Sequence, residues 1–203
     1  MKRRRTAKRR RRGSAGRSAA GRIAALALIV VVTPFVLVGI LSLPNWISPR
    51  GIVVHHSALG GNADGRADAA VIDAVHERRG WGAFWGGRIY HIGYHYVIRP
   101  DGTVEPGRPE RCRGAHTRGF NDSLGICVLG NFNDAAPTVQ QRRALAALCR
   151  RLLRRYDLRP EDVRPHRDCP AAATDCPGKR FPFAALRRDL EPVRAAAKAR
   201  RPG

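Results

Sequence analysis

Acidic residues are scarce in this 203-residue chain, which has 16 Asp and Glu against 38 Lys and Arg and a formal net charge of +22. Residues 1–22 contain 11 basic residues and no acidic one, so this segment alone supplies half of the net charge. Basic runs can bind nucleic-acid phosphates, but a position directly before an apolar run favours membrane orientation and contact with anionic lipid. We therefore expect no specific nucleic-acid partner.

Charged residues are absent from residues 23–43, where only Thr33 and Ser42 have polar side chains. A helix of this length spans a hydrocarbon core of about 30 Å, so we expect a single transmembrane anchor. The positive-inside rule keeps residues 1–22 in the cytoplasm and places the rest on the periplasmic or extracellular side of a bacterial inner membrane. A cleaved secretory signal is the alternative, but the apolar run is long and no Ala-x-Ala stands directly before Pro44.

The five cysteines are an odd number, so a domain in an oxidising compartment keeps at least one of them unpaired. Cys127 lies in an apolar run and Cys149 on the expected buried face of a helix, which favours small core residues. The sequence leaves open the pairing of Cys112, Cys127, Cys149 and Cys169.

Outside the first 43 residues, the chain has no internal repeats and divides into a linker (44–50), one domain (51–190) and a basic tail (191–203). Strands interleaved with helices predict an α/β domain in which helices cover one sheet. A Thr-x-x-Gln capping box at residue 138 begins the clearest helix. The other expected elements are a buried strand (52–57), a helix (66–79), a hairpin (93–105) and a second buried strand (124–130).

His55, His166 and Cys176 are the candidate metal ligands. Imidazole nitrogen and thiolate sulfur are donors that zinc prefers, and three of them leave one tetrahedral position for a water whose pKa falls to about 7. This pattern favours a hydrolase that uses Zn²⁺. A structural zinc site is the alternative, but such sites usually have four protein ligands.

Several motifs occur in one order: His55, Tyr94, Gly-Ala-His-Thr at 114–117, Asn121, Gly-Asn-Phe at 130–132 and the segment 166–176. With these motifs the chain resembles the zinc N-acetylmuramoyl-L-alanine amidases, type 2, a family that includes peptidoglycan recognition proteins and phage lysozyme-type amidases. The resemblance covers roughly residues 51–190. It implies a mixed sheet flanked by helices, zinc at the bottom of an open groove, and cleavage of the amide between N-acetylmuramic acid and L-alanine in peptidoglycan or muropeptides.

The resemblance also implies roles for single residues. His55 rather than His56 falls on the first ligand position, because it stands two residues before Ser57, and His56 should point to the opposite face of the strand. Tyr94 falls on the catalytic tyrosine, and Thr174 falls on a position that stabilises the developing oxyanion. From the residues themselves, we expect His116 to touch the peptide or position water in the groove rather than to be a fourth metal ligand, which would close the site. Arg118 and Asn121 are expected to contact the stem peptide, whose carboxylates suit a cation.

Cys127 occupies the position of a glutamate base in relatives that process anhydro-muropeptides, so the chain is more similar to the tyrosine-dependent branch. Cys169 is the alternative to Cys176 as a ligand, but only Cys176 precedes the Pro-Gly that follows the ligand in relatives. Two rival functions remain open: a peptidoglycan-binding module without catalysis, and a cytoplasmic enzyme for recycled muropeptides. The filled ligand positions argue against the first, and the apolar segment argues against the second. The oligomeric state is not indicated.

Overall fold

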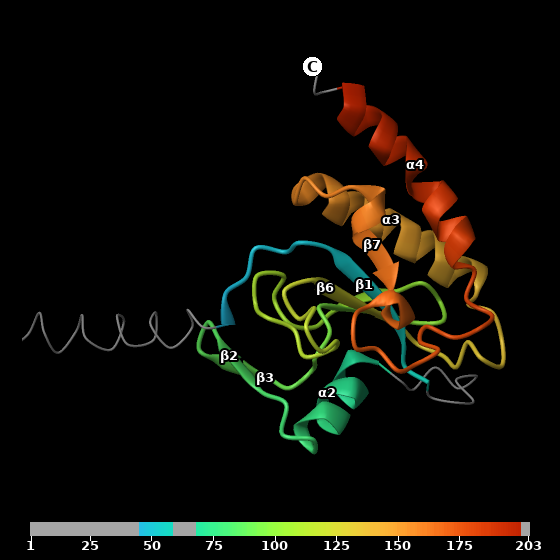
Figure 1. Ribbon diagram of the computed structural model, residues 1–203. Coiled ribbons are helices and arrows are strands. Elements are labelled where there is room, and N and C mark those ends of the chain that lie inside the picture. The colour runs from blue at the N-terminus through green and yellow to red at the C-terminus, as the bar shows by residue number, and fades with distance from the viewer. Residues whose placement is uncertain (1–44, 59–67, 200–203) are drawn as a thin grey trace, which may run out of the picture. The chain divides into compact units, whose positions relative to one another are not determined.

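The apolar run near residue 52 forms β1 (Ile52–His56), whose five residues are all buried. In the computed structural model, which describes residues 45–58 and 68–199, this strand lies inside a five-stranded sheet with the order β5-β4-β6-β1-β7 (Figure 1). β6 (Leu124–Val128) and β7 (Val163–Pro165) pair with β1 on either side, and both run parallel to it. A strand that pairs with neighbours on both edges and is covered on both faces needs mostly apolar side chains. Residues 52–54 of β1 meet this need.

The sheet is mixed because its edge is a hairpin. β4 (Tyr96–Ile98) runs parallel to β6, and β5 (Val104–Pro106) returns antiparallel to β4. A separate two-stranded sheet joins β2 (Ala83–Trp85) to β3 (Arg88–Tyr90). The prediction of one α/β domain with a mixed sheet flanked by helices is confirmed for the described residues.

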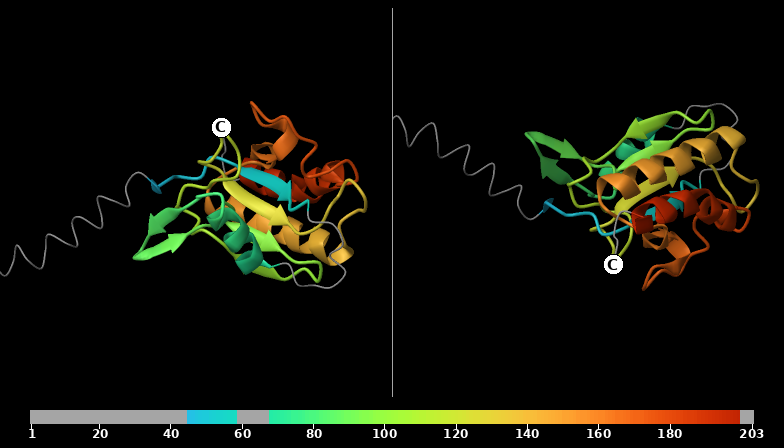
Figure 2. Two further views of the ribbon diagram at one scale, coloured as in Figure 1. Left: turned by 90° about the horizontal axis from the view of Figure 1, so that it is seen from below. Right: turned by 90° about the horizontal axis from the view of Figure 1, so that it is seen from above.

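Helices cover both faces of the sheet. α3 (Val139–Arg155) and α4 (Phe183–Ala199) lie together across one face, and α2 (Ala69–Glu77) lies on the other side (Figure 2). Two short 3₁₀ helices, η3 (Pro160–Asp162) and η4 (His166–Asp168), flank β7.

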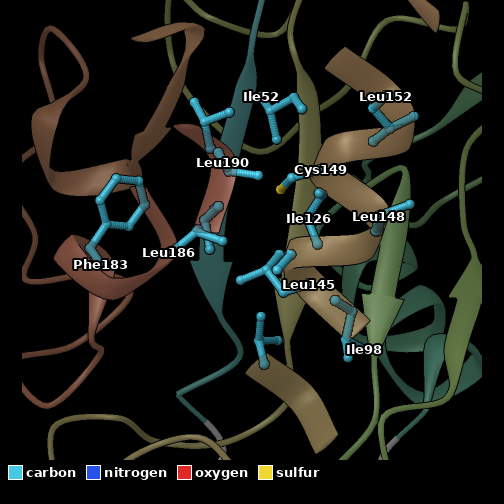
Figure 3. Close-up of a cluster of buried hydrophobic side chains, with 14 of the residues drawn as sticks. Ile52, Ile98, Ile126, Leu145, Leu148, Cys149, Leu152, Phe183, Leu186 and Leu190 are labelled. Carbon is cyan, nitrogen blue, oxygen red and sulfur yellow. The ribbon is translucent and has the colours of Figure 1, made fainter. Parts of the chain in front are cut away.

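The face under α3 and α4 is an apolar core. Alternate residues of β1 and β6, among them Ile52 and Ile126, meet Leu145, Leu152 and Leu190 of the two helices (Figure 3). The predicted capping box is present, since the Thr138 hydroxyl accepts from the Gln141 amide nitrogen and the Gln141 side chain accepts from the Thr138 amide nitrogen. This cap begins α3 at the position that the sequence indicates.

The opposite face has a smaller apolar cluster and more polar groups. Ile72 of α2 packs with Ile92, Val97, Cys127 and Leu129. Buried histidines, among them His55, His95 and His116, occupy much of the rest of this layer. The sheet therefore separates a hydrophobic interior from a polar site.

Several expected boundaries differ in detail, and both buried strands end earlier than predicted, at His56 and Val128. The helix predicted over 66–79 is α2 from Ala69, because Asp68 caps its first turn with a side-chain bond to the Val71 amide; residues 59–67 lie outside the described residues. Residues 45–50 of the predicted linker contact the domain, where Ile47 is buried and its amide donates to the Arg111 carbonyl. The helix α4 continues through the predicted tail as far as Ala199.

The predicted transmembrane segment (23–43) and the basic segment before it lie outside the described residues. No helix within the described part of the chain has the length and apolar character needed to cross a membrane.

Candidate metal centre and active site

The end of β1 divides two neighbouring histidines between the two faces of the sheet. The His55 ring lies on the α2 side, where only 1% of the residue is exposed. The His56 ring points the other way, and its Nδ1 accepts a hydrogen bond from the Phe132 amide nitrogen at 3.2 Å. The period of two along a strand produces this division, as the sequence predicts.

The structure brings His55, His166 and Cys176 together. One possible ligand atom from each lies within 4.8 Å of the others, and no other such group of His, Cys, Asp or Glu occurs among the residues that the structure describes. His55 Nδ1 is 3.8 Å from Cys176 Sγ. Two such atoms around one tetrahedral zinc stand about 3.6 Å apart, so the donor set fits this metal.

Cys169, the alternative ligand, points elsewhere. Its thiol contacts the Pro165 carbonyl oxygen at 3.8 Å, and it is not part of the donor cluster. Cys176 instead accepts a hydrogen bond from the His56 amide nitrogen, 3.4 Å from Sγ. That contact stabilises the thiolate form, which is the form that binds metal.

Burial keeps the donor groups uncharged before any metal binds. Desolvation, with further contributions from His116 and His166, holds the pKa of His55 well below its usual range. Desolvation raises the pKa of Cys176 to about 11. A neutral imidazole is ready to donate a lone pair, whereas the thiol must lose its proton when a metal binds.

Tyr94 stands beside the cluster. Its ring centroid is 5.1 Å from that of His55, and its side chain packs against the apolar cluster that includes Cys127. Burial is the largest of the effects that raise the pKa of Tyr94 well above its ordinary value. The phenol therefore remains protonated at neutral pH and can act as a donor.

Cys127 is buried as expected, but the sequence did not indicate its contact with Tyr94. The residue pairs with His55 across β1 and β6, so its side chain emerges on the same face of the sheet. This register places the Cys127 thiol, rather than a carboxylate, beside the Tyr94 side chain. Burial raises the pKa of Cys127, which keeps the thiol neutral.

The three expected groove residues are placed differently from one another. The His116 ring is buried, and its centroid is 5.1 Å from that of His55. The Asn121 side-chain oxygen accepts the amide nitrogens of both His116 and Thr117 at 2.9 Å. Arg118 is exposed beside them.

Thr174 is exposed near the cluster. Its hydroxyl oxygen accepts a hydrogen bond from the Cys176 amide nitrogen at 3.1 Å, which links it to the segment that carries the thiol. A hydroxyl that accepts in this way can still donate its hydrogen to another group.

Two residues of α2 support the tyrosine, and sequence reasoning did not assign them chemistry. Asp73 Oδ1 accepts the amide nitrogens of His91 and Ile92, and His76 Nδ1 accepts that of Gly93. The His76 ring also packs against Tyr94, with centroids 5.5 Å apart. Their spacing of three residues on one helix was the only available signal, because it places both on one face.

The chain belongs to the family described as N-acetylmuramoyl-L-alanine amidase, whose family model matches residues 45–179. The resemblance inferred from the ordered motifs is thereby confirmed. Among relatives, the endolysin of Escherichia phage T7 is 35% identical over 88 residues, which cover 40% of this chain and 53% of the endolysin. The chain thus spans about half the length of that relative.

Other relatives cover more of the domain. A peptidoglycan-recognition protein of Drosophila melanogaster is 30% identical over 142 residues, which are 67% of this chain and 72% of that protein. The solved structure of the N-acetylmuramoyl-L-alanine amidase LysC from Clostridium intestinale URNW is 38% identical, with a TM-score of 0.60 over 71% of this chain and 87% of that chain. The relatives therefore include both named amidases and recognition proteins.

Proposed function

We propose that this protein is a zinc-dependent N-acetylmuramoyl-L-alanine amidase, which hydrolyses the amide between N-acetylmuramic acid and the L-alanine of the stem peptide. One observation carries the proposal: His55, His166 and Cys176 present three metal donors at one point, with Tyr94 packed against the first of them. Three protein ligands leave a position open, which is the arrangement of catalytic rather than structural zinc.

Zinc held by these residues would supply a Lewis acid for the amide carbonyl and a water of lowered pKa as nucleophile. The chain's own contribution is to stabilise the charge that develops on the carbonyl oxygen. The Tyr94 hydroxyl, which keeps its proton, donates to that oxygen, and Thr174 is the proposed second donor. Removal of one such donor slows comparable reactions about 10²- to 10³-fold.

The leaving amine of L-alanine must gain a proton before it departs. The attacking water releases a proton, and Tyr94 or a second water passes it to that amine, since the tyrosine is a protonated group beside the cluster. Arg118, which is exposed, is the proposed contact for a carboxylate of the stem peptide. Asn121 supports that contact by holding the loop through its two backbone hydrogen bonds.

We also propose that residues 23–43 anchor the enzyme in a bacterial inner membrane as a single span. The uncharged 21-residue run and its basic flank support this location, with the amidase domain on the periplasmic or extracellular side. Peptidoglycan lies on that side, so the proposed substrate and the proposed location agree.

The test is release of L-alanyl amino termini from purified peptidoglycan by the full chain with zinc. Cys176→Ala should lower the rate about 10³-fold or more, because it removes one of the three metal donors. Cys169→Ala is the matched control, since that buried thiol lies outside the donor cluster, and its rate should stay close to the parent's.

Peptidoglycan binding without amine release, by a folded parent that contains zinc, would contradict the proposal. That outcome would assign the chain to the recognition proteins of the family instead. A reporter that is active only outside the membrane, fused to the C-terminus, tests the location separately; an inactive fusion would contradict the proposed orientation.

A further inference from the structure

The His55 ring is held through Nε2, the nitrogen that faces away from the other candidate metal ligands. Its Nδ1 is the atom near Cys176 Sγ, whereas its Nε2 is 3.1 Å from His116 Nδ1 and 3.3 Å from Thr117 Oγ1. His55 thus presents one nitrogen to the donor cluster and the other to the loop that begins with Gly114. A histidine can serve as a metal ligand through Nδ1 only when that nitrogen carries no proton.

The contact made by Nε2 of His116 determines which nitrogen of that ring carries the proton. His116 Nε2 is 3.0 Å from the Ser123 carbonyl oxygen, and a carbonyl can only accept a hydrogen bond. His116 Nε2 therefore carries the proton. In a neutral imidazole the second nitrogen is then an acceptor, so His116 Nδ1 receives a hydrogen bond.

The proton position on His55 is fixed by its contact with His116. If His55 Nε2 lacked a proton, two nitrogen lone pairs would face each other across 3.1 Å, and the Thr117 hydroxyl hydrogen could serve only one of them. A proton on His55 Nε2 removes this conflict and leaves Nδ1 bare beside Cys176. The order of donation is His55 to His116, and His116 to Ser123.

We propose that His116 is a positioning residue, which fixes the tautomer and the ring orientation of the metal ligand His55. This inference rests on the proposed zinc function of the site. It gives His116 a role behind the metal ligand rather than in contact with the stem peptide. Residues that hold a ligating histidine in this way typically affect metal affinity 10- to 100-fold.

Two glycines form the slot that holds the His116 ring. A Cβ atom added to either Gly114 or Gly125 would lie 2.5 Å from His116 Cδ2, closer than real side-chain contacts occur. Gly125 belongs to β6 and pairs with Val53 of β1, so the sheet itself forms one wall of the slot. This close fit restricts the His116 ring to the plane in which both hydrogen bonds form.

His95 offers a matched control within the same layer. It is 1% exposed, its Nε2 is 2.8 Å from the Cys112 carbonyl oxygen, and its Nδ1 accepts from the Gly125 amide. Its ring centroid lies 5.9 Å from that of His116, but no hydrogen bond joins it to His55 among the described contacts. His95 therefore shares the burial and the backbone contacts of His116 without the link to the ligand.

The first experiment measures the zinc dissociation constant of the full chain by competition with a chelator. His116→Phe should weaken zinc binding about 10- to 100-fold. Adding Thr117→Val to that variant should weaken binding further, because both acceptors of the His55 proton are then lost. His116→Asn, which can return an acceptor oxygen near the position of Nδ1, should give an intermediate value. His95→Phe should destabilise the fold and leave zinc affinity unchanged.

Unchanged zinc affinity in folded His116→Phe, or an equal loss in His95→Phe, would overturn the proposal. If His116→Phe does not fold, ¹⁵N NMR of the imidazole nitrogens in the metal-free parent decides the matter. The expected spectrum has the proton of both His55 and His116 on Nε2. A His55 proton on Nδ1 would overturn the proposal, whereas a parent chain that binds no zinc would contradict the proposed function itself.

Discussion

The two faces of the central sheet are stabilised by different interactions, although the same strands supply both. On the α3 and α4 side, Val54 and Ile126 pack among leucines in an apolar cluster. On the α2 side, the adjacent His55 and Cys127 meet histidines and a tyrosine. One step along β1 exchanges a hydrophobic environment for a hydrogen-bonded one.

This difference separates stability from chemistry. The apolar face contributes through burial, which is roughly proportional to area and tolerates little loss of volume. The polar face contributes through directed hydrogen bonds, which hold His55 and Tyr94 in fixed orientations. Substitutions of His55 and Tyr94 should therefore affect zinc affinity or kcat, whereas substitutions on the apolar face should affect stability alone.

The largest effect on stability should come from the apolar face. Leu152→Ala removes a fully buried side chain and should lower the free energy of unfolding by about 2–5 kcal/mol. Val139→Ala, at an exposed site on the same helix, is the control and should change it little. Chemical denaturation measures both, and a parallel loss of zinc affinity in folded Leu152→Ala would break the separation of the two faces.

Two nearby tyrosines lie on opposite faces of the sheet. Tyr94 packs against the smaller apolar cluster on the site face, and Tyr96 packs against the apolar core on the other face. The Tyr96 hydroxyl donates to Glu110. Tyr94→Phe should lower kcat about 10²- to 10³-fold through loss of a donor to the oxyanion, with little change in stability. Tyr96→Phe should leave kcat unchanged. Steady-state kinetics on muropeptides tests this, and equal kcat losses would refute it.

Acid should weaken the polar face before the apolar one. Desolvation, with a contribution from Arg108, lowers the pKa of His95 to about 4, against an ordinary value of 6.5. The unfolded chain therefore binds the proton first, so stability is fully present above pH 6.5 and falls as the pH decreases toward 4. The loss from His95 approaches about 3 kcal/mol.

Unfolding free energies between pH 7 and 4 measure this loss. His95→Gln removes the titrating group and should flatten that part of the profile, although its stability at pH 7 is lower. A profile for His95→Gln as steep as the parent's would assign the acid sensitivity to other groups. The apolar cluster should contribute nothing in this range, since none of its members titrates there.

The smallest effect should come from the cap of α3. Thr138→Ala removes the acceptor for the Gln141 amide nitrogen, 3.0 Å away, and should cost about 1 kcal/mol of stability with no change in kcat. Thr138→Ser retains the oxygen and should recover most of the loss. Thermal denaturation is sufficient to compare them, and a loss of activity in Thr138→Ala would link the helix cap to the site.

Much of the fold was predictable because it depends on local patterns. The capping box, a motif of four residues that begins at Thr138, specifies where α3 starts. Alternation along β1 assigns His55 and His56 to opposite faces. The donor types of His166 and Cys176 similarly indicate zinc from chemistry alone. None of these inferences requires knowledge of distant contacts.

The supporting parts of the site were not predictable in this way. Cys127 contacts Tyr94 because β6 pairs in register with β1, and His116 fits its slot because Gly114 and Gly125 approach it from separate segments. Two α2 residues, Asp73 and His76, support the tyrosine from a helix that the sequence could place only approximately. Each contact joins residues whose proximity follows from the folded path of the chain.

The strand and helix patterns thus follow from the sequence, because periodicity and capping are properties of neighbouring residues, and ligand chemistry together with the ordered motifs indicates the candidate metal donors. Only the folded chain shows which nitrogen of His55 faces the donor cluster, and which groups hold the other nitrogen. Strand register and the approach of glycine backbones control that choice, and both arise only when segments distant in the sequence pack together.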